Sequence, residues 1–475
     1  MKSKRIMPLI LSTVMLFSTA GCGKTVTTVE SKTYDVEPAY SLSFDALGGK
    51  DVMPLGVWWG PYRWEWGSQD GNIVPDYLTD KYYKLLQECG VNMITIARNN
   101  FLAQEQRQNI YDALDYCQKY GMGSIVQDSY IYNYDHINKN ALLEHLANYI
   151  NHPACIGVHC IDEPKANAFN KVKEKVDAYN SLGIEDKIIS VNLYGNSNSP
   201  TNLSGDSVGI SFENYIKTFL EKVDVKFLGT DIYVFYEPTE EGGSAQADSK
   251  RFYEDLAIKR KYAQLHGIPF WCCIQAGDPG YFAGTEYVVE HLYPNESEFI
   301  WNVNASLAFG SKGFTYFTAF QPDGMCLLPG GERDFNRTGF FGMAGNINRW
   351  YYYAQKVNKQ IAAIDHILMN SCNMGVIPSG KAEQEISGEV KISSFRELKS
   401  VTSTAGETLI GCFDFLGKTV LFVVNNSTTQ KQDITLNFDN SYGYEIIQRA
   451  VSVDAAGASI KLTAEAGEGI LVRLK

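Results

Sequence analysis

The chain has 475 residues, a formal net charge of −12 and 45% hydrophobic residues, a composition that is typical of an ordinary folded protein. The acidic balance argues against nucleic-acid binding, which depends on basic side chains that contact phosphates. The ten cysteines include no CxxC pair, so a zinc ribbon has no support. We expect no metal and no other cofactor.

The N-terminus has the pattern of a bacterial lipoprotein signal. Three basic residues lie within the first five positions, an apolar segment covers residues 6–17, and Ser18–Cys22 is similar to a lipobox. We expect a signal peptide over residues 1–21, a lipid on Cys22 and a linker over residues 22–37. The protein would then be tethered at the cell surface, to the outer face of the cytoplasmic membrane. Plain secretion without a lipid is the alternative.

Between residues 38 and 370, strand-like runs alternate with amphipathic helical patterns. The eight strand-like runs are short and apolar, and they cover residues 55–59, 91–97, 123–127, 154–161, 187–193, 226–235, 268–274 and 313–320. The helical patterns cover residues 76–89, 104–120, 138–151, 166–182, 211–223, 249–266, 295–309 and 345–368. Eight strands that are each followed by a helix predict an α/β fold, a parallel (β/α)8 TIM barrel.

Helical periodicity disappears after about residue 371. Strand runs separated by turns follow, at residues 408–415, 419–424, 433–438, 444–451 and 469–474. They predict a C-terminal all-β sandwich over residues 371–475. We expect this accessory domain to support the barrel, and carbohydrate binding is the alternative role.

The tripeptide Asp162-Glu163-Pro164 ends the fourth strand-like run. Barrel enzymes carry their chemistry at the C-terminal ends of their strands, and burial there raises the pKa of a glutamate so that it can donate a proton. Pro164 is expected to hold Glu163 in an extended backbone conformation. We therefore predict that Glu163 is a general acid, with Asp162 and Asp231 as catalytic partners. Alternatively, Glu163 is solvated or caps the next helix, and Asp231 is a buried aspartate bonded to Arg98 or to backbone amides.

The other strand ends carry aromatic, amide and charged residues. Aromatic faces stack on the apolar faces of sugar rings, while amides and carboxylates bind hydroxyl groups, so this set favours a carbohydrate substrate. The candidate substrate-binding residues are Trp58, Trp59, Arg98, Asn99, Asp128, Asn192, Tyr194, Tyr233, Trp271, Gln275 and Tyr316.

Two segments carry a resemblance to a known family. Residues 157–164 resemble the fourth-strand motif of the superfamily of retaining (β/α)8 glycoside hydrolases, and residues 305–317 resemble the seventh helix and eighth strand of its β-galactosidase-like members. Arg98 matches the strand-two arginine of that group. The resemblance covers about residues 50–370, and it implies that Glu163 is the acid/base of a glycoside hydrolase.

The chain departs from this superfamily at two positions. The family's nucleophile is a glutamate at the end of strand seven, where this chain has Gln275, and an asparagine commonly precedes the acid, where this chain has Asp162. An amide cannot form a glycosyl ester. Asp231 or Asp278 is then one candidate for the second carboxylate, and a wide carboxyl separation predicts inversion.

Two further hypotheses address the missing nucleophile. The Asp-Glu pair resembles that of substrate-assisted hexosaminidases, in which the aspartate orients the acetamido group of the substrate. Alternatively, the protein is a lipid-anchored glycan-binding protein without catalysis. An esterase is a separate hypothesis, because residues 205–209 match GxSxG. The polar, proline-containing segment before Ser207 is typical of a loop, whereas the esterase motif needs a strand there.

Overall fold

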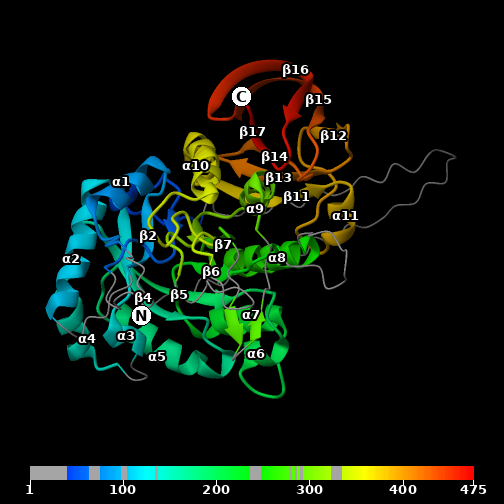
Figure 1. Ribbon diagram of the computed structural model, residues 1–475. Coiled ribbons are helices and arrows are strands. Elements are labelled where there is room, and N and C mark those ends of the chain that lie inside the picture. The colour runs from blue at the N-terminus through cyan, green and yellow to red at the C-terminus, as the bar shows by residue number, and fades with distance from the viewer. Residues whose placement is uncertain are drawn as a thin grey trace. The chain divides into compact units, whose positions relative to one another are not determined.

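Eight parallel strands close into a barrel in the order β1-β10-β7-β6-β5-β4-β3-β2 (Figure 1). Each of the eight expected runs overlaps one of these strands, so the TIM-barrel prediction is confirmed. The strands are β1 (Leu55–Val57), β2 (Met93–Ala97), β3 (Gly123–Val126), β4 (Cys155–Asp162), β5 (Ile188–Tyr194), β6 (Leu228–Asp231), β7 (Phe270–Gln275) and β10 (Phe314–Phe317).

The computed structural model describes residues 40–63, 75–97, 104–133, 137–235, 248–277, 281–283, 286–288, 293–322 and 334–475. All of them belong to one compact unit, Glu37–Lys475. Within these ranges, no helix combines the length and apolar character needed to cross a membrane. The eight cysteines that the structure describes are all buried and unpaired, as expected for small core residues.

Amphipathic helices connect the strands, as their sequence periodicity predicted. The expected helices are α1 (Asp80–Glu88), α2 (Gln104–Lys119), α4 (Lys139–Leu146), α5 (Phe169–Asn180), α7 (Phe212–Lys222), α8 (Ser249–His266), α9 (Glu296–Ala308) and α10 (Arg349–Leu368). The 3-10 turn η3 (Ala166–Ala168) begins the expected helical segment 166–182, which continues as α5. Short elements that were not expected are η1 (Asp45–Leu47), α3 (Ser129–Asn133), α6 (Pro200–Ser204) and the hairpin of β8 (Tyr281–Ala283) with β9 (Glu286–Val288).

The segment before Ser207 corrects one expectation. It contains α6 instead of being wholly a loop, because Ser199 caps the helix by accepting a hydrogen bond from the Asn202 N–H and Pro200 begins it. Ser207 follows in an exposed turn. No strand leads into this serine, so the GxSxG match lacks the geometry of an esterase.

A hydrophobic layer closes the N-terminal end of the barrel. Side chains alternate between the two faces of each strand, so every second residue points into the barrel. Phe44 and Leu47, at the start of the described chain, pack against inward-facing residues from the beginnings of the strands. Those residues are Met93, Ile125, Ile156, Ile188 and Trp271, with Phe227 just before β6.

Residues 371–475 form an antiparallel β domain, which confirms the predicted all-β character. The strand order is β11-β13-β14-β17-β15-β12, with β16 paired to β15. The strands are β11 (Ser371–Pro378), β12 (Leu398–Ser403), β13 (Thr408–Phe415), β14 (Lys418–Asn425), β15 (Gln432–Gln448), β16 (Val451–Ala464) and β17 (Gly469–Leu474), and the short helix α11 (Lys381–Glu385) follows β11. The long strand β15 replaces two expected strands, and β11, β12 and β16 were not expected.

This β domain packs directly against helices α8 and α9 of the barrel. Arg260 on α8 donates two hydrogen bonds to Asn373, and Asn304 on α9 donates one to the backbone oxygen of Gly467. Gly411 on β13 approaches Ala308 so closely that a Cβ would lie 2.4 Å from its carbonyl oxygen. All seven aromatic residues of the β domain are buried or half-buried, so they offer no flat exposed surface for a sugar. These observations favour the supporting role.

Candidate functional site

Three carboxyl groups meet at the C-terminal end of the barrel. Asp162 is the last residue of β4, Glu163 follows it, and Asp231 is the last residue of β6. Strand β5 lies between β4 and β6, and its Asn192 donates Nδ2 to Asp162 Oδ1 at 3.0 Å and to Asp231 Oδ1 at 3.3 Å. The side chains of Glu163 and Asp231 also share a hydrogen bond. We call these three acids the carboxylate cluster.

The backbone at Glu163 differs from the expectation. Its φ is +47°, in the left-handed region, although the following proline was expected to impose an extended conformation. Two hydrogen bonds maintain this turn: the Glu163 N–H donates to Asn192 O at 2.8 Å, and the Tyr215 hydroxyl of α7 donates to Pro164 O at 2.6 Å. The turn directs the Glu163 side chain toward Asp231, and strain of this kind is concentrated at functional sites.

Burial and mutual repulsion raise the pKa values of all three carboxyl groups. Burial raises the pKa of Asp162 to about 6, against a smaller opposing effect of its hydrogen bond from Asn192. The pKa of Glu163 lies well above its ordinary value because of burial and the charges of Asp231 and Asp162. Burial and Asp162 likewise raise the pKa of Asp231. Since like charges in contact cannot both ionise readily, Glu163 and Asp231 hold one proton between them near neutral pH.

Half-buried aromatic rings surround the carboxylate cluster. The acids contribute to the raised pKa values of Tyr132, Tyr194 and Tyr233, after burial, which shows that these phenols face the cluster. The Phe317 ring links Tyr233 to Trp59, with ring centroids 5.5 Å apart in each pair. The carboxyl groups therefore lie among half-buried aromatic rings.

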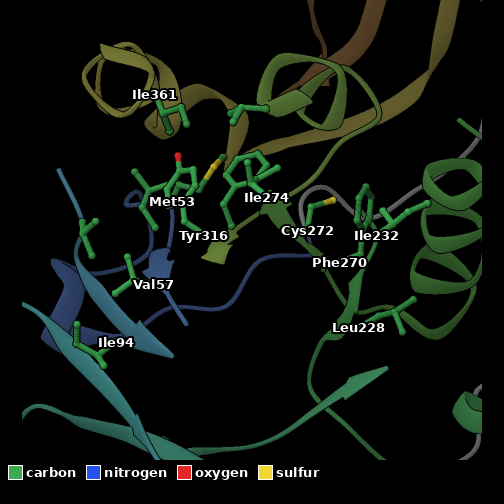
Figure 2. Packing of buried hydrophobic residues seen from close by; sticks show 14 of the residues in the cluster. Met53, Val57, Ile94, Leu228, Ile232, Phe270, Cys272, Ile274, Tyr316 and Ile361 are labelled. Carbon is green, nitrogen blue, oxygen red and sulfur yellow. The ribbon is translucent and has the colours of Figure 1, made fainter. Parts of the chain in front are cut away.

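Three predicted substrate-binding residues lie away from this site. Tyr316 points to the helix side of β10, where its hydroxyl donates to Asn358 of α10 at 2.5 Å, and Figure 2 shows it packed near Met53 and Ile361. Trp271 belongs to the hydrophobic layer at the opposite end of the barrel. Asp128 is fully buried and accepts hydrogen bonds from the Tyr130 N–H and the Tyr149 hydroxyl. We correct these three assignments, because strand parity or burial directs the side chains elsewhere.

Gln275 does occupy the end of β7, on the inward face. Its side chain is 1% exposed, accepts a hydrogen bond from the Phe235 N–H at 3.3 Å and donates one to Gly277 O at 3.0 Å. The amide is thus hydrogen-bonded to the backbone on both sides, and β7 ends in an amide side chain where the resemblance implied a carboxylate.

The remaining predictions divide into two groups. Trp58 points into the barrel with its ring edge-on to His159, 5.4 Å between centroids. Four other predicted residues lie outside the described residues, namely Cys22, Arg98, Asn99 and Asp278. Among the residues that the structure does describe, no group of three His, Cys, Asp or Glu side chains has the arrangement of a metal site.

Sequence reasoning missed two features of the site. Tyr215 was assigned only to the α7 pattern, because a hydrogen bond to Pro164 O cannot be inferred from helical periodicity. Phe317 was noted on the eighth strand but not chosen as a substrate-binding residue, and it contacts Tyr233 at the site, whereas its neighbour Tyr316 does not lie there. The parity of β10 was the available signal: if Thr315 points inward, Phe317 does so and Tyr316 does not.

The comparisons with known proteins support the fold. No protein-family model matches the chain, and no curated protein matches it. A solved structure described as a glycoside hydrolase is similar, with a TM-score of 0.52, 10% sequence identity, and coverage of 89% of this chain and 93% of that one. A family 5 glycoside hydrolase from Bacteroides vulgatus ATCC 8482 has a TM-score of 0.50 and 11% identity, with 89% of each chain covered. The chain therefore shares a fold that glycoside hydrolases use.

Proposed function

We propose that this protein hydrolyses glycosidic bonds of an oligo- or polysaccharide, with Glu163 as the general acid. One observation carries the proposal: the Glu163 carboxyl group is buried beside the carboxyl groups of Asp231 and Asp162 at the C-terminal end of the barrel, which raises its pKa. A carboxyl group that remains protonated near neutral pH can deliver its proton to a glycosidic oxygen. The fold shared with glycoside hydrolases supports the same assignment.

The contact between Glu163 and Asp231 limits the mechanism. Carboxyls that flank a scissile bond lie about 5 Å or more apart, whereas these two share a hydrogen bond. The main role of Asp231 is therefore to raise the pKa of Glu163, so that Glu163 stays protonated. Asp162, with its pKa of about 6, is largely ionised at neutral pH. We propose that it accepts a hydrogen bond from the attacking water or from an N–H group at carbon two of the sugar.

The test is the Glu163→Gln variant, assayed for sugar release from a panel of aryl glycosides and polysaccharides. The variant should retain binding and lose about 10²- to 10⁴-fold in rate, because it has no proton to donate. Asp177→Asn, an exposed acid on α5, is the matched control and should keep full activity. A fully active Glu163→Gln variant would overturn the proposal.

One observation favours a second candidate, a glycan-binding protein without catalysis. The position of the usual nucleophile is filled by Gln275, which is bound to the backbone. In that case wild type and the Glu163→Gln variant would bind glycans equally well, and neither would release sugar. Calorimetric binding of the same panel distinguishes the two candidates.

We also propose that Cys22 carries a lipid that tethers the protein outside the cytoplasmic membrane. The basic, apolar and lipobox pattern of residues 1–22 supports this proposal. A Cys22→Ala variant expressed in a bacterial host should lose palmitate labelling and detergent-dependent extraction. Labelling that persists in this variant would contradict the anchor.

A further inference from the structure

The barrel interior directly below the carboxylate cluster is built from small and polar side chains. Strand alternation points Thr95, Ser190, Cys273 and Thr315 inward, between the hydrophobic layer and the acids. His159 of β4 lines the same space, on a strand whose pairing with both neighbours has irregularities. Barrels of this type usually fill such a layer with branched apolar residues. Here the smaller side chains leave a cavity of about 30 Å³, which we call the chamber. All five residues line it, together with others that include Trp58, Asn192 and Trp271.

Three chamber residues carry buried polar atoms without a hydrogen-bond partner in the described part of the chain, namely His159 Nε2, Thr230 Oγ1 and Trp271 Nε1. Their side chains are only 1%, 1% and 3% exposed. The other ring nitrogen of His159, Nδ1, lies 3.0 Å from Ser190 Oγ, within hydrogen-bond distance. Buried polar atoms of this kind are normally satisfied by protein or by ordered water.

We propose that the chamber binds about two ordered water molecules, which satisfy His159 Nε2 and Trp271 Nε1 and hydrate the carboxylate cluster from below. A water molecule needs about 10–15 Å³ of such volume, so about two fit. Asn192 connects the chamber to the acids, because it lines the chamber and also donates to Asp162 and Asp231. This inference does not depend on glycoside hydrolysis, since it concerns the hydration of the site and not its substrate.

The first experiment is a crystal structure of the chain at about 1.5 Å resolution, as wild type and with two substitutions of Ser190. Wild type should show two solvent peaks, one of them within hydrogen-bond distance of His159 Nε2. Ser190→Val adds two methyl groups to the chamber wall and should displace the waters. Ser190→Ala removes the same hydroxyl without filling space, and should keep them. A chamber without density in wild type would overturn the proposal, as would peaks that Ser190→Val leaves unchanged.

The second experiment measures the pKa of Asp162 by ¹³C NMR with labelled aspartate, assigned with Asp162→Asn. The ionisable groups that face Asp162 are Tyr132, Glu163, Tyr194, Asp231 and Cys273, and the pKa of each is raised. Labelled aspartate also reports the titration of Asp231, which is followed in the same spectra. Ser190→Val should raise the pKa of Asp162 by about half a unit to one unit, since less water then solvates the carboxylate. Ser190→Ala should leave the pKa within 0.2 units, roughly the precision of such a titration.

An unchanged pKa in a dehydrated Ser190→Val protein would show that the waters do not hydrate the cluster. If Ser190→Val does not fold, His159→Leu provides the same test, because it replaces the polar partner by an apolar side chain. Neither readout requires enzymatic activity, so failure here is distinct from failure of the proposed function.

Discussion

The carboxyl groups of Glu163 and Asp231 share a hydrogen bond although they end strands β4 and β6, which are separated by β5. Two features bring them together: the left-handed turn at Glu163 and the amide of Asn192, which bonds Asp162 and Asp231 from β5. The consequence is a proton held at the end of the barrel at a pH where an isolated glutamate would have lost it.

The Asp231→Asn variant should change the pH dependence of hydrolysis. The Asp231 charge contributes to the raised pKa of Glu163, so its removal lowers that pKa. Activity that requires protonated Glu163 is lost as pH rises through this pKa, and the alkaline limb of kcat/KM should therefore move down by about one unit or more. Asp177→Asn serves as the surface control. If the alkaline limb does not move, the charge of Asp231 does not affect the pKa of Glu163.

The Asp162→Asn variant should change how stability depends on pH. The folded pKa of Asp162 is about 6, above its ordinary value of 3.8, so the folded state binds this proton more tightly than the unfolded state. The resulting stabilisation is complete below about pH 4 and is lost as pH rises through 6. The variant has no such loss, and relative to wild type it should gain about 1–3 kcal/mol in unfolding free energy between pH 4 and 7. Urea unfolding of both proteins at pH 4 and at pH 7 measures their free energies of unfolding. If the variant differs from wild type by the same amount at both pH values, the burial of Asp162 is contradicted.

The Tyr215→Phe variant should identify a positioning residue. Its hydroxyl donates to Pro164 O and supports the turn that aims Glu163. Loss of this bond should cost about 1 kcal/mol in stability and lower kcat while KM changes little, because Glu163 becomes less well placed. Tyr262→Phe removes a hydroxyl that bonds Glu213, away from the carboxylate cluster, and should leave kcat unchanged. Equal effects of the two substitutions on kcat would indicate a purely structural role for Tyr215.

Restoring a carboxylate at the end of β7 by Gln275→Glu should not create a nucleophile. The Gln275 amide donates to Gly277 O, and a carboxylate there would face that carbonyl oxygen without a proton to share. The variant should lose about 1–3 kcal/mol in unfolding free energy and gain no activity. Gln275→Met, which keeps the length of the side chain without a charge, is the matched control for packing. A covalent glycosyl-enzyme trapped on Gln275→Glu, detected by mass spectrometry, would contradict this expectation.

The barrel was predictable from the chain because its signals are local. Apolar runs and helical periods each lie within a few consecutive residues, and eight strand–helix units leave one common closed architecture. Asp162 directly follows the predicted run 154–161, and Asn192 and Asp231 lie within the predicted runs 187–193 and 226–235. The prediction for Tyr316 was wrong because a run of apolar residues does not reveal which alternate set points inward. The prediction for Trp271 was wrong because this residue lies at the start of β7, at the opposite end of the barrel from the acids.

The sequence by itself thus determined the eight-stranded barrel, the all-β character of the C-terminal domain, and the residues that stand at the strand ends. Only the tertiary structure decided that Glu163 and Asp231 share one proton, that Gln275 is bound to the backbone, and that a polar chamber lies below the acids. The physical reason is that pKa values and hydrogen bonds depend on distances of a few ångströms between side chains far apart in the chain. Those distances are set by strand register and by one unusual backbone turn, which hydrophobic periodicity does not encode.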